Sequence, residues 1–226
     1  MRTLTLLFSF MTAFPFVLSA QSAGELLQKV SAALSEEQDD YAVSLFRQSI
    51  DAEADQAEMF YWTHIEKSSP VAPHLINELA TYYKRKRNYD KAYLFYREYL
   101  QYHSEDIAAL VSCAEMEMMR GKEKDAVETY EKVLMHDANN LQANIFLGNY
   151  FYLQAEQEKK TLDSNYKRIT SPTRMQHARY RNSLSAVYSN SYSKAKDYLQ
   201  RVLQLFPSTE AGNILEKIKK LETEMK

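Results

Sequence analysis

The sequence predicts an all-α fold of stacked antiparallel helix pairs, an α-solenoid, and three observations lead to this prediction. The 226 residues include only four glycines and five prolines, whereas a β-sandwich or barrel needs many turns. Apolar residues recur at helical spacing along most of the chain. Small residues also recur at a fixed interval of 34 residues, at Ala80, Ala114 and Gly148. A hydrophobic content of 45% is sufficient for a core and argues against disorder.

Residues 1–20 have the layout of a secretory signal peptide. Arg2 precedes an apolar run, Leu4 to Leu18, and small residues follow up to Ala20. We expect cleavage after Ala20 and a soluble periplasmic or secreted protein, because the run is shorter than the roughly 20 apolar residues that cross a bilayer. The alternative is an uncleaved membrane anchor. No Cys follows the run, which excludes a lipid-modified lipoprotein.

Residues 21–72 are predicted to form a degenerate helix pair and one further helix. The apolar stretch from Leu26 to Leu34 supplies the first helix. The second helix carries the small and apolar residues of the repeating pattern: Ala42, Phe46 and Ile50. Residues 55–66 are expected to form the third helix, which is too short for a whole repeat.

Two complete repeats follow, at 73–106 and 107–140. Ala92 and Ala126 are again 34 residues apart, and their surroundings superpose without a gap. A small residue on each of two packed helices lets their backbones approach closely, while large residues one turn away fill the flanks. We therefore expect these small residues to be buried at helix–helix contacts.

Turn and capping residues fall at the expected breaks. Asn88 and Gly121 are predicted to mark the turns within the two pairs. Ser104 and Asn140 are predicted to cap the helices that follow them, and Pro73 suits a first helical turn.

The third repeat, 141–207, is interrupted by an insertion at about 155–190. Its first helix is expected at Leu141 to Leu153, and its second helix carries the small residue Ala195. We predict that the insertion is a helical hairpin, because structureless loops of this length are rare in compact domains. In this hairpin Ser171 and Pro172 would begin the returning arm, which would project roughly 20–25 Å. The alternative is a mobile loop, which the Ser/Asn-rich end of the insertion favours.

Residues 208–226 are predicted to form a capping helix, with apolar residues on one face and charge elsewhere. Together, the small and aromatic residues in 34-residue helix-turn-helix units resemble the tetratricopeptide repeat, over nearly all of 21–226. Two apolar positions of the pattern carry polar residues, since Glu117 replaces an aromatic residue and Asn144 replaces an aliphatic one. Ser104 and Ala138 also stand where the family usually has Pro. The resemblance implies an exported cell-envelope repeat protein of the kind found in Gram-negative bacteria, which binds another protein as a scaffold or adaptor.

No residue pattern indicates catalysis, a cofactor or a metal site. The five histidines are scattered without ligand spacing, and no glycine-rich phosphate loop or serine nucleophile motif is present. The single cysteine, Cys113, excludes an internal disulfide and is expected to behave as a small buried hydrophobe. The net charge of -2 gives no reason to expect nucleic-acid binding.

The resemblance implies a concave groove lined by the first helix of each repeat. Its lining positions would be His74, Asn77, Thr81, Lys84, Ala108, Val111, Glu115, Met118, Gln142, Ile145, Asn149 and Tyr152. This mixture of polar and apolar residues favours an extended or helical peptide as the ligand. Some relatives hold the terminal carboxylate of a peptide with paired Asn and basic residues. In this sequence, Asn77, Lys84 and Asn149 match that arrangement only weakly.

The insertion is strongly basic, and we call its seven cations the basic arm. They are Lys159, Lys160, Lys167, Arg168, Arg174, Arg179 and Arg181. Against them stands one acidic residue, Asp163, so residues 159–190 carry +6 and the rest of the mature chain carries -9. The arm could meet an acidic protein, and the alternative function is recognition of an anionic envelope polymer or a lipid surface. A solvated hairpin without a partner explains the charge equally well.

Overall fold

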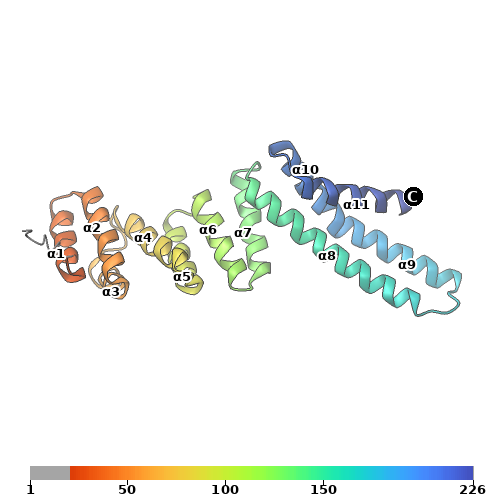
Figure 1. Cartoon of the computed structure of the whole chain (residues 1–226), viewed down its shortest axis with the longest axis horizontal. Helices are drawn as coiled ribbons and strands as arrows, with labels where there is room; N and C mark the ends of the chain where they lie inside the picture. Colours follow the sequence, from red (N-terminus) through yellow and green to blue (C-terminus); the bar gives the residue numbers. More distant parts are fainter. Residues whose placement is uncertain (1–20, 226) are drawn as a thin grey trace, which may run out of the picture. The chain divides into compact units, whose positions relative to one another are not determined.

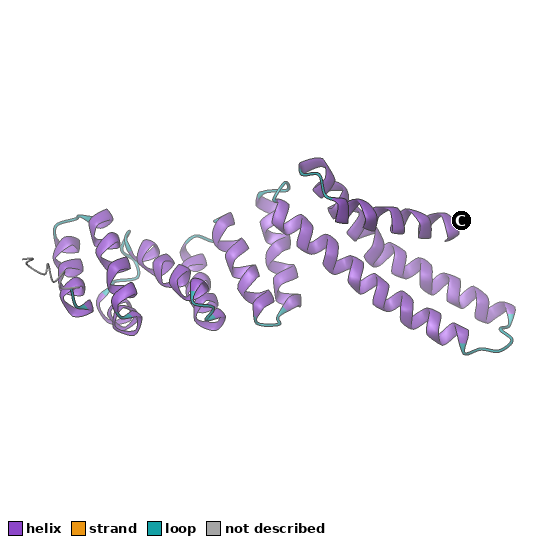
Figure 2. Cartoon of the chain, viewed as in Figure 1, coloured by secondary structure: helices purple, strands orange, loops and turns teal. Residues whose placement is uncertain are grey.

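The computed structural model describes residues 21–225, which form two compact units. Unit 1 ends at Ile65 and unit 2 begins at Glu66, so the expected boundary at 72 falls inside unit 2. All regular structure in the described residues is helical (Figure 2). The fold class predicted from the sequence is therefore correct. The predicted signal peptide, 1–20, lies outside the described residues.

Unit 1 consists of three helices that pack on one another. They are α1 (Ala23–Ser35), α2 (Asp39–Ala52) and α3 (Ala54–His64). Ser22 caps α1 by accepting a hydrogen bond from the backbone N–H of Glu25. The small residue Ala42 and the aromatic Phe46 are fully buried, so the predicted spacing of the second helix forms the core of this unit.

Unit 2 begins with two helix pairs that match the predicted repeats (Figure 1). The first pair is α4 (Ala72–Arg85) with α5 (Tyr89–Tyr102), and the second is α6 (Ile107–Met119) with α7 (Glu123–His136). The four small residues of these repeats have no exposed surface: Ala80, Ala92, Ala114 and Ala126. The prediction that small residues form the helix contacts is confirmed.

The third repeat contains a long helical hairpin, and the predicted ordered arms are confirmed. The outgoing helix α8 (Leu141–Lys167) has 27 residues and is therefore about 40 Å long. The returning helix α9 (Arg174–Val187) passes through a π-helical turn, η1 (Tyr188–Tyr192), into α10 (Ser193–Leu205). The backbone keeps right-handed helical angles at Val187, Tyr192 and Ser193, so the Ser/Asn-rich segment is helical and not a loop.

Close packing of the third repeat depends on Gly148. This residue lies on α8, opposite Leu199 on α10, and both are buried. A Cβ atom at position 148 would lie 2.8 Å from both the Cγ and a Cδ atom of Leu199. Only glycine therefore permits this approach without a shift of the neighbouring helix.

Tyrosine side chains hold the two arms of the hairpin together. The rings of Tyr166 and Tyr180 stack with their centroids 4.4 Å apart. The Tyr180 hydroxyl donates to Asp163 at 2.6 Å, and this hydrogen bond, together with burial, raises the pKa of Tyr180 to about 12. Nearer the base, the Tyr192 hydroxyl donates to Glu156 at 2.6 Å.

Of the predicted caps and turns, two are wrong and three are confirmed. Asp106, not Ser104, caps α6, because its carboxylate reaches the backbone N–H of Ala109 at 3.0 Å. Asp106 also accepts a hydrogen bond from the Tyr99 hydroxyl, which fixes its position. Thr173, not Ser171, caps α9, where it forms a capping box with Gln176. The predicted caps or turns at Asn88, Asn140 and Gly121 are as expected.

The two polar residues at apolar positions of the repeat pattern are buried, and they differ in how their polar atoms are satisfied. The Asn144 amide donates to the carbonyl oxygens of Ala138 at 3.1 Å and Asn140 at 2.8 Å, so it ties α8 to the preceding turn. Glu117 has 5% of its surface exposed, and its Oε2 atom has no hydrogen-bond partner among the described residues. Burial raises the pKa of this carboxyl, although a hydrogen bond from Thr129 opposes the shift.

The last helix, α11 (Thr209–Met225), covers α10. Ile214, Ile218 and Leu221 are its buried face, as predicted for a capping helix. Lys196 on α10 donates to Glu222 on α11 at 3.1 Å, which also fixes the contact. Within residues 21–225, no helix combines the length and hydropathy needed to cross a membrane.

Candidate partner-binding cleft

A cleft of about 910 Å³ opens in unit 2, over the C-terminal ends of α4 and α6 and along α8. We call it the methionine cleft. Its walls include four partly or largely exposed apolar residues: Met118, Met119, Ile145 and Leu153. Leu153 has 65% of its surface exposed, and with these neighbours it forms an exposed apolar surface around the cleft.

Aromatic rings form the deeper part of the cleft. Phe146 lies 4.7 Å from Tyr130 and 6.0 Å from Tyr150, measured between ring centroids. All three line the cleft. Burial and the nearby Glu115 carboxylate raise the pKa of Tyr130 to about 12, so its hydroxyl remains neutral and available as a donor.

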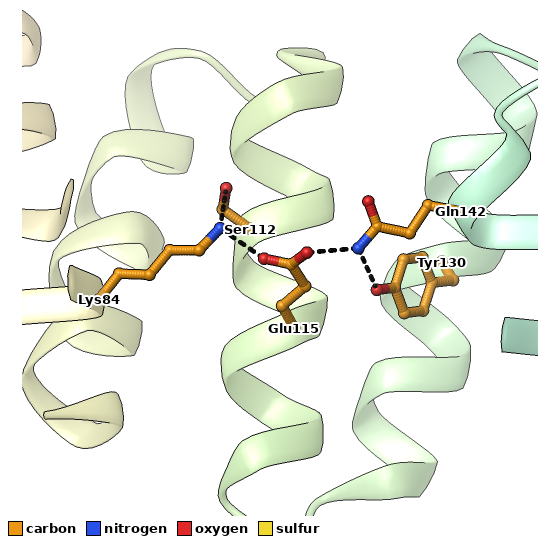
Figure 3. Close-up of polar contacts among 5 residues, drawn as sticks. All are labelled: Lys84, Ser112, Glu115, Tyr130 and Gln142. Carbon is orange, nitrogen blue, oxygen red and sulfur yellow. Dashed lines mark hydrogen bonds and ion pairs between the residues drawn. The ribbon is translucent and has the colours of Figure 1, made fainter. Parts of the chain in front are cut away.

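A polar network crosses the floor of the cleft (Figure 3). Lys84 on α4 forms an ion pair with Glu115 on α6 and reaches the Ser112 hydroxyl at 3.3 Å. The Gln142 amide on α8 donates to Glu115 and also to the Tyr130 hydroxyl, at 3.3 Å. The network therefore joins all four helices that form the floor, and it satisfies the Lys84 charge internally.

The insertion lengthens the cleft. Gln154 and Gln157 line it beyond Leu153, which is where the first helix of the repeat was expected to end. The same two amides line a second cleft of about 590 Å³ between α8 and α9, next to Leu162 and Val187. The elongated α8 is therefore one continuous wall for both clefts.

The predicted groove residues separate into two groups. Six of them line the methionine cleft: Lys84, Glu115, Met118, Gln142, Ile145 and Asn149. His74, Asn77, Thr81, Ala108 and Val111 belong to earlier turns of α4 and α6 and do not line it. Tyr152 packs edge-on against Tyr192 at the base of the hairpin, so it is also outside the cleft.

Sequence reasoning missed several cleft residues, above all Leu153 and the three aromatic residues. The Tyr130 side chain is buried, but its hydroxyl reaches the cleft, where it accepts a hydrogen bond from Gln142. Leu153 is exposed on a face of the elongated helix α8 that no other helix in the described residues covers, and the 34-residue repeat pattern does not describe such a face.

Two of the seven cations of the basic arm have a partner within the chain, and the other five are exposed. Lys159 pairs with Asp163 at 3.1 Å on α8, and Arg181 donates to the backbone carbonyl of Met225 at 3.1 Å. The other five cations are exposed on the hairpin: Lys160, Lys167, Arg168, Arg174 and Arg179. Three of these lie within one helical turn of the loop between α8 and α9, or in it: Lys167, Arg168 and Arg174.

Cys113 has the buried position expected of it. Burial, with a smaller contribution from Glu117, raises the pKa of its thiol to about 12, so the reactive thiolate does not form at neutral pH. In the described part of the chain, no group of three His, Cys, Asp or Glu side chains is arranged to hold a metal ion.

A solved structure from Bacteroides ovatus ATCC 8483 is similar to this chain over most of its length. It superposes with a TM-score of 0.80 and 53% sequence identity, covering 91% of this chain and 100% of the other. This chain belongs to the same family as the Bacteroides ovatus protein. The Bacteroides ovatus protein is named as a candidate protein-binding protein.

Other comparisons add little to this family assignment. A tetratricopeptide repeat protein from Parabacteroides merdae ATCC 43184 superposes with a TM-score of 0.39 and 16% identity, covering 90% of this chain and 74% of the other. No protein-family model and no curated protein matches the sequence of this chain.

Proposed function

We propose that the protein is an exported, non-catalytic scaffold that binds a peptide segment of another protein in the methionine cleft. The observation that carries this proposal is the apolar wall formed by Met118, Met119, Ile145 and Leu153, which is exposed around a cleft of about 910 Å³. Exposed apolar surface around a concavity is typical of a binding site. The related Bacteroides ovatus protein, named as a candidate protein-binding protein, supports the same interpretation.

The chemistry of the cleft fits a peptide better than a small polar molecule. Flexible methionine side chains adapt to different apolar shapes, and the exposed glutamine amides Gln142, Gln154 and Gln157 can bond peptide groups. The face of α8 between Gln142 and Gln157 is about 22 Å long, enough for several turns of a helical segment. Export rests on the layout of residues 1–20.

Photo-crosslinking in the native cells tests this function. A photoreactive amino acid would replace Leu153 in the cleft, with Met135 as the matched control on the exposed surface of α7. Met135 has 79% of its surface exposed and does not line the cleft. We expect a crosslinked protein at position 153 and none at 135. Equal capture at both positions, or no capture at 153, would contradict the proposal.

The second candidate function is binding of an anionic polymer or lipid surface through the basic arm. The exposed cations around the hairpin loop, Lys167, Arg168 and Arg174, favour it. Binding to vesicles containing anionic lipid should then fall steeply between low and moderate salt. It should also be lost when Arg168, Arg174 and Arg179 are replaced by Gln. If vesicle binding persists in that variant, the arm has no such role.

A further inference from the structure

A second, polar pocket adjoins the methionine cleft, and we call it the turn pocket. It has a volume of about 540 Å³ and lies between the α4–α5 turn and the α6–α7 turn. Its charged lining residues are Lys86, Arg87, Asp90, Arg120 and Lys122. Arg87, Tyr89 and Met119 line both cavities, so a single ligand can occupy them together.

The turn pocket has an excess of positive charge. Its only carboxylate, Asp90, accepts a hydrogen bond from Arg120 at 2.6 Å. Arg120 also lies over the Tyr93 ring, at 4.1 Å from its centroid, so this cation is already engaged. Three exposed cations then remain without a carboxylate in the pocket: Lys86, Arg87 and Lys122. The Lys86 ammonium lies over the Tyr82 ring, 5.5 Å from its centroid, and is exposed beside it.

The backbone places these three cations at the two turns. Arg87 has a φ of 59° in the turn after α4, and its N–H donates to the carbonyl of Lys84. Lys122 is the N-cap residue of α7, and Lys86 is the C-cap residue of α4. The opposite end of the methionine cleft is lined by Gln154 and Gln157, which are neutral. Arg85 and Glu123 line the methionine cleft beside the two turns and carry opposite charges, so the turn end of the combined site keeps its positive excess and the two ends differ in charge.

We propose that the segment bound in the methionine cleft carries Asp or Glu residues beside its apolar residues, and that Lys86, Arg87 and Lys122 hold these carboxylates in the turn pocket. This inference rests on the proposed function, and it adds the chemistry and the polarity of the partner. Complementary charge at one end of an apolar cleft would fix the direction in which the segment binds. We assign the site to a peptide because the cleft also presents the exposed side-chain amides of Gln154 and Gln157, which can bond peptide groups.

Selection from a displayed library of random 12-residue peptides tests the inference, with the purified protein as the target. We expect the selected peptides to combine apolar residues with two or three acidic residues at one end. A charge-reversed variant, Lys86→Glu with Arg87→Glu and Lys122→Glu, should select basic residues at that end instead. The matched control reverses three cations of the basic arm, Arg168, Arg174 and Arg179, and should select the same acidic peptides as the wild-type protein.

A second measurement requires no change to the protein. Replacing the acidic residues of a selected peptide by Gln should weaken its binding about tenfold, the effect of two or three partly exposed ion pairs. The inference is overturned if the selected peptides lack acidic residues, if the charge-reversed variant selects the same peptides, or if no peptide is selected. The function proposed above stands independently of these results, because it requires only that a protein is captured at Leu153 and not at Met135.

Discussion

Replacing Gly148 by Ala tests the helix seam on which the third repeat depends. The new methyl group would lie 2.8 Å from the Cγ of Leu199, and the backbone nitrogen of Leu199 lies 3.5 Å away. Leu199 has 2% of its surface exposed, so its side chain has no free space into which to move. Overpacking of this kind costs about 1–3 kcal/mol. The gain in helix propensity from Gly to Ala returns about 1 kcal/mol, so we expect a net loss of up to about 2 kcal/mol.

Gly212 provides a matched control for this substitution. It lies in α11 of the same unit, and a Cβ atom there would meet no atom within 4 Å. Gly212→Ala should therefore leave stability unchanged or raise it by up to about 1 kcal/mol. Urea unfolding followed by circular dichroism measures both variants. If Gly148→Ala is as stable as Gly212→Ala, the close approach of α8 and α10 is wrong.

A double substitution identifies the atom responsible. When Leu199 is already replaced by Ala, the clashing side chain is absent, and Gly148→Ala should no longer be destabilising. If it costs the same in both backgrounds, the loss does not arise from Leu199.

Three further predictions concern buried polar groups. The pKa of the Glu117 carboxyl is raised in the folded state, so the free energy of unfolding of the wild-type protein falls as pH rises through this raised pKa. In urea unfolding, Glu117→Gln should therefore gain about 1 kcal/mol in stability relative to the wild type between pH 4 and pH 7. An equal difference between the two proteins at both pH values would refute this prediction. In the same assay, Asn144→Leu should lose about 1–2 kcal/mol of stability, because the carbonyl oxygen of Ala138 loses its hydrogen-bond donor. Leu suits the repeat pattern at this position, so a stabilised variant would show that the hydrogen bond is dispensable. Cys113 should resist a thiol reagent at pH 8 in the native protein and react in denaturant, and rapid native labelling would contradict its burial.

The helices could be predicted well because single small residues mark the places where two helices are in contact. Ala80, Ala114 and Gly148 mark positions where backbones approach, and this requirement survives where other residues vary. Caps were harder to predict, since several residues near a helix start can accept a backbone hydrogen bond. At α6, Asp106 is the cap in place of Ser104 because it directly precedes Ile107, the first residue of the helix, and its carboxylate reaches the backbone N–H of Ala109.

The candidate site could be predicted only in part. The repeat register placed Lys84, Glu115 and Asn149 at the cleft, but it gave the same weight to His74 and Asn77, which lie on earlier turns of α4. The register describes one helix pair at a time, whereas the cleft is formed by four helices and by the elongation of α8. The turn pocket was missed for a related reason, because its cations come from two turns 34 residues apart.

The affinity of the crosslinked partner for two exposed-surface variants tests the central claim most directly. Leu153→Asp places a charge in the methionine cleft, and Met135→Asp places the same charge on the exposed surface of α7, outside it. Both side chains are largely exposed, so both variants should fold. We predict that Leu153→Asp weakens binding at least about tenfold, while Met135→Asp leaves it unchanged. Equal affinities for the two variants would contradict the assignment of binding to the cleft.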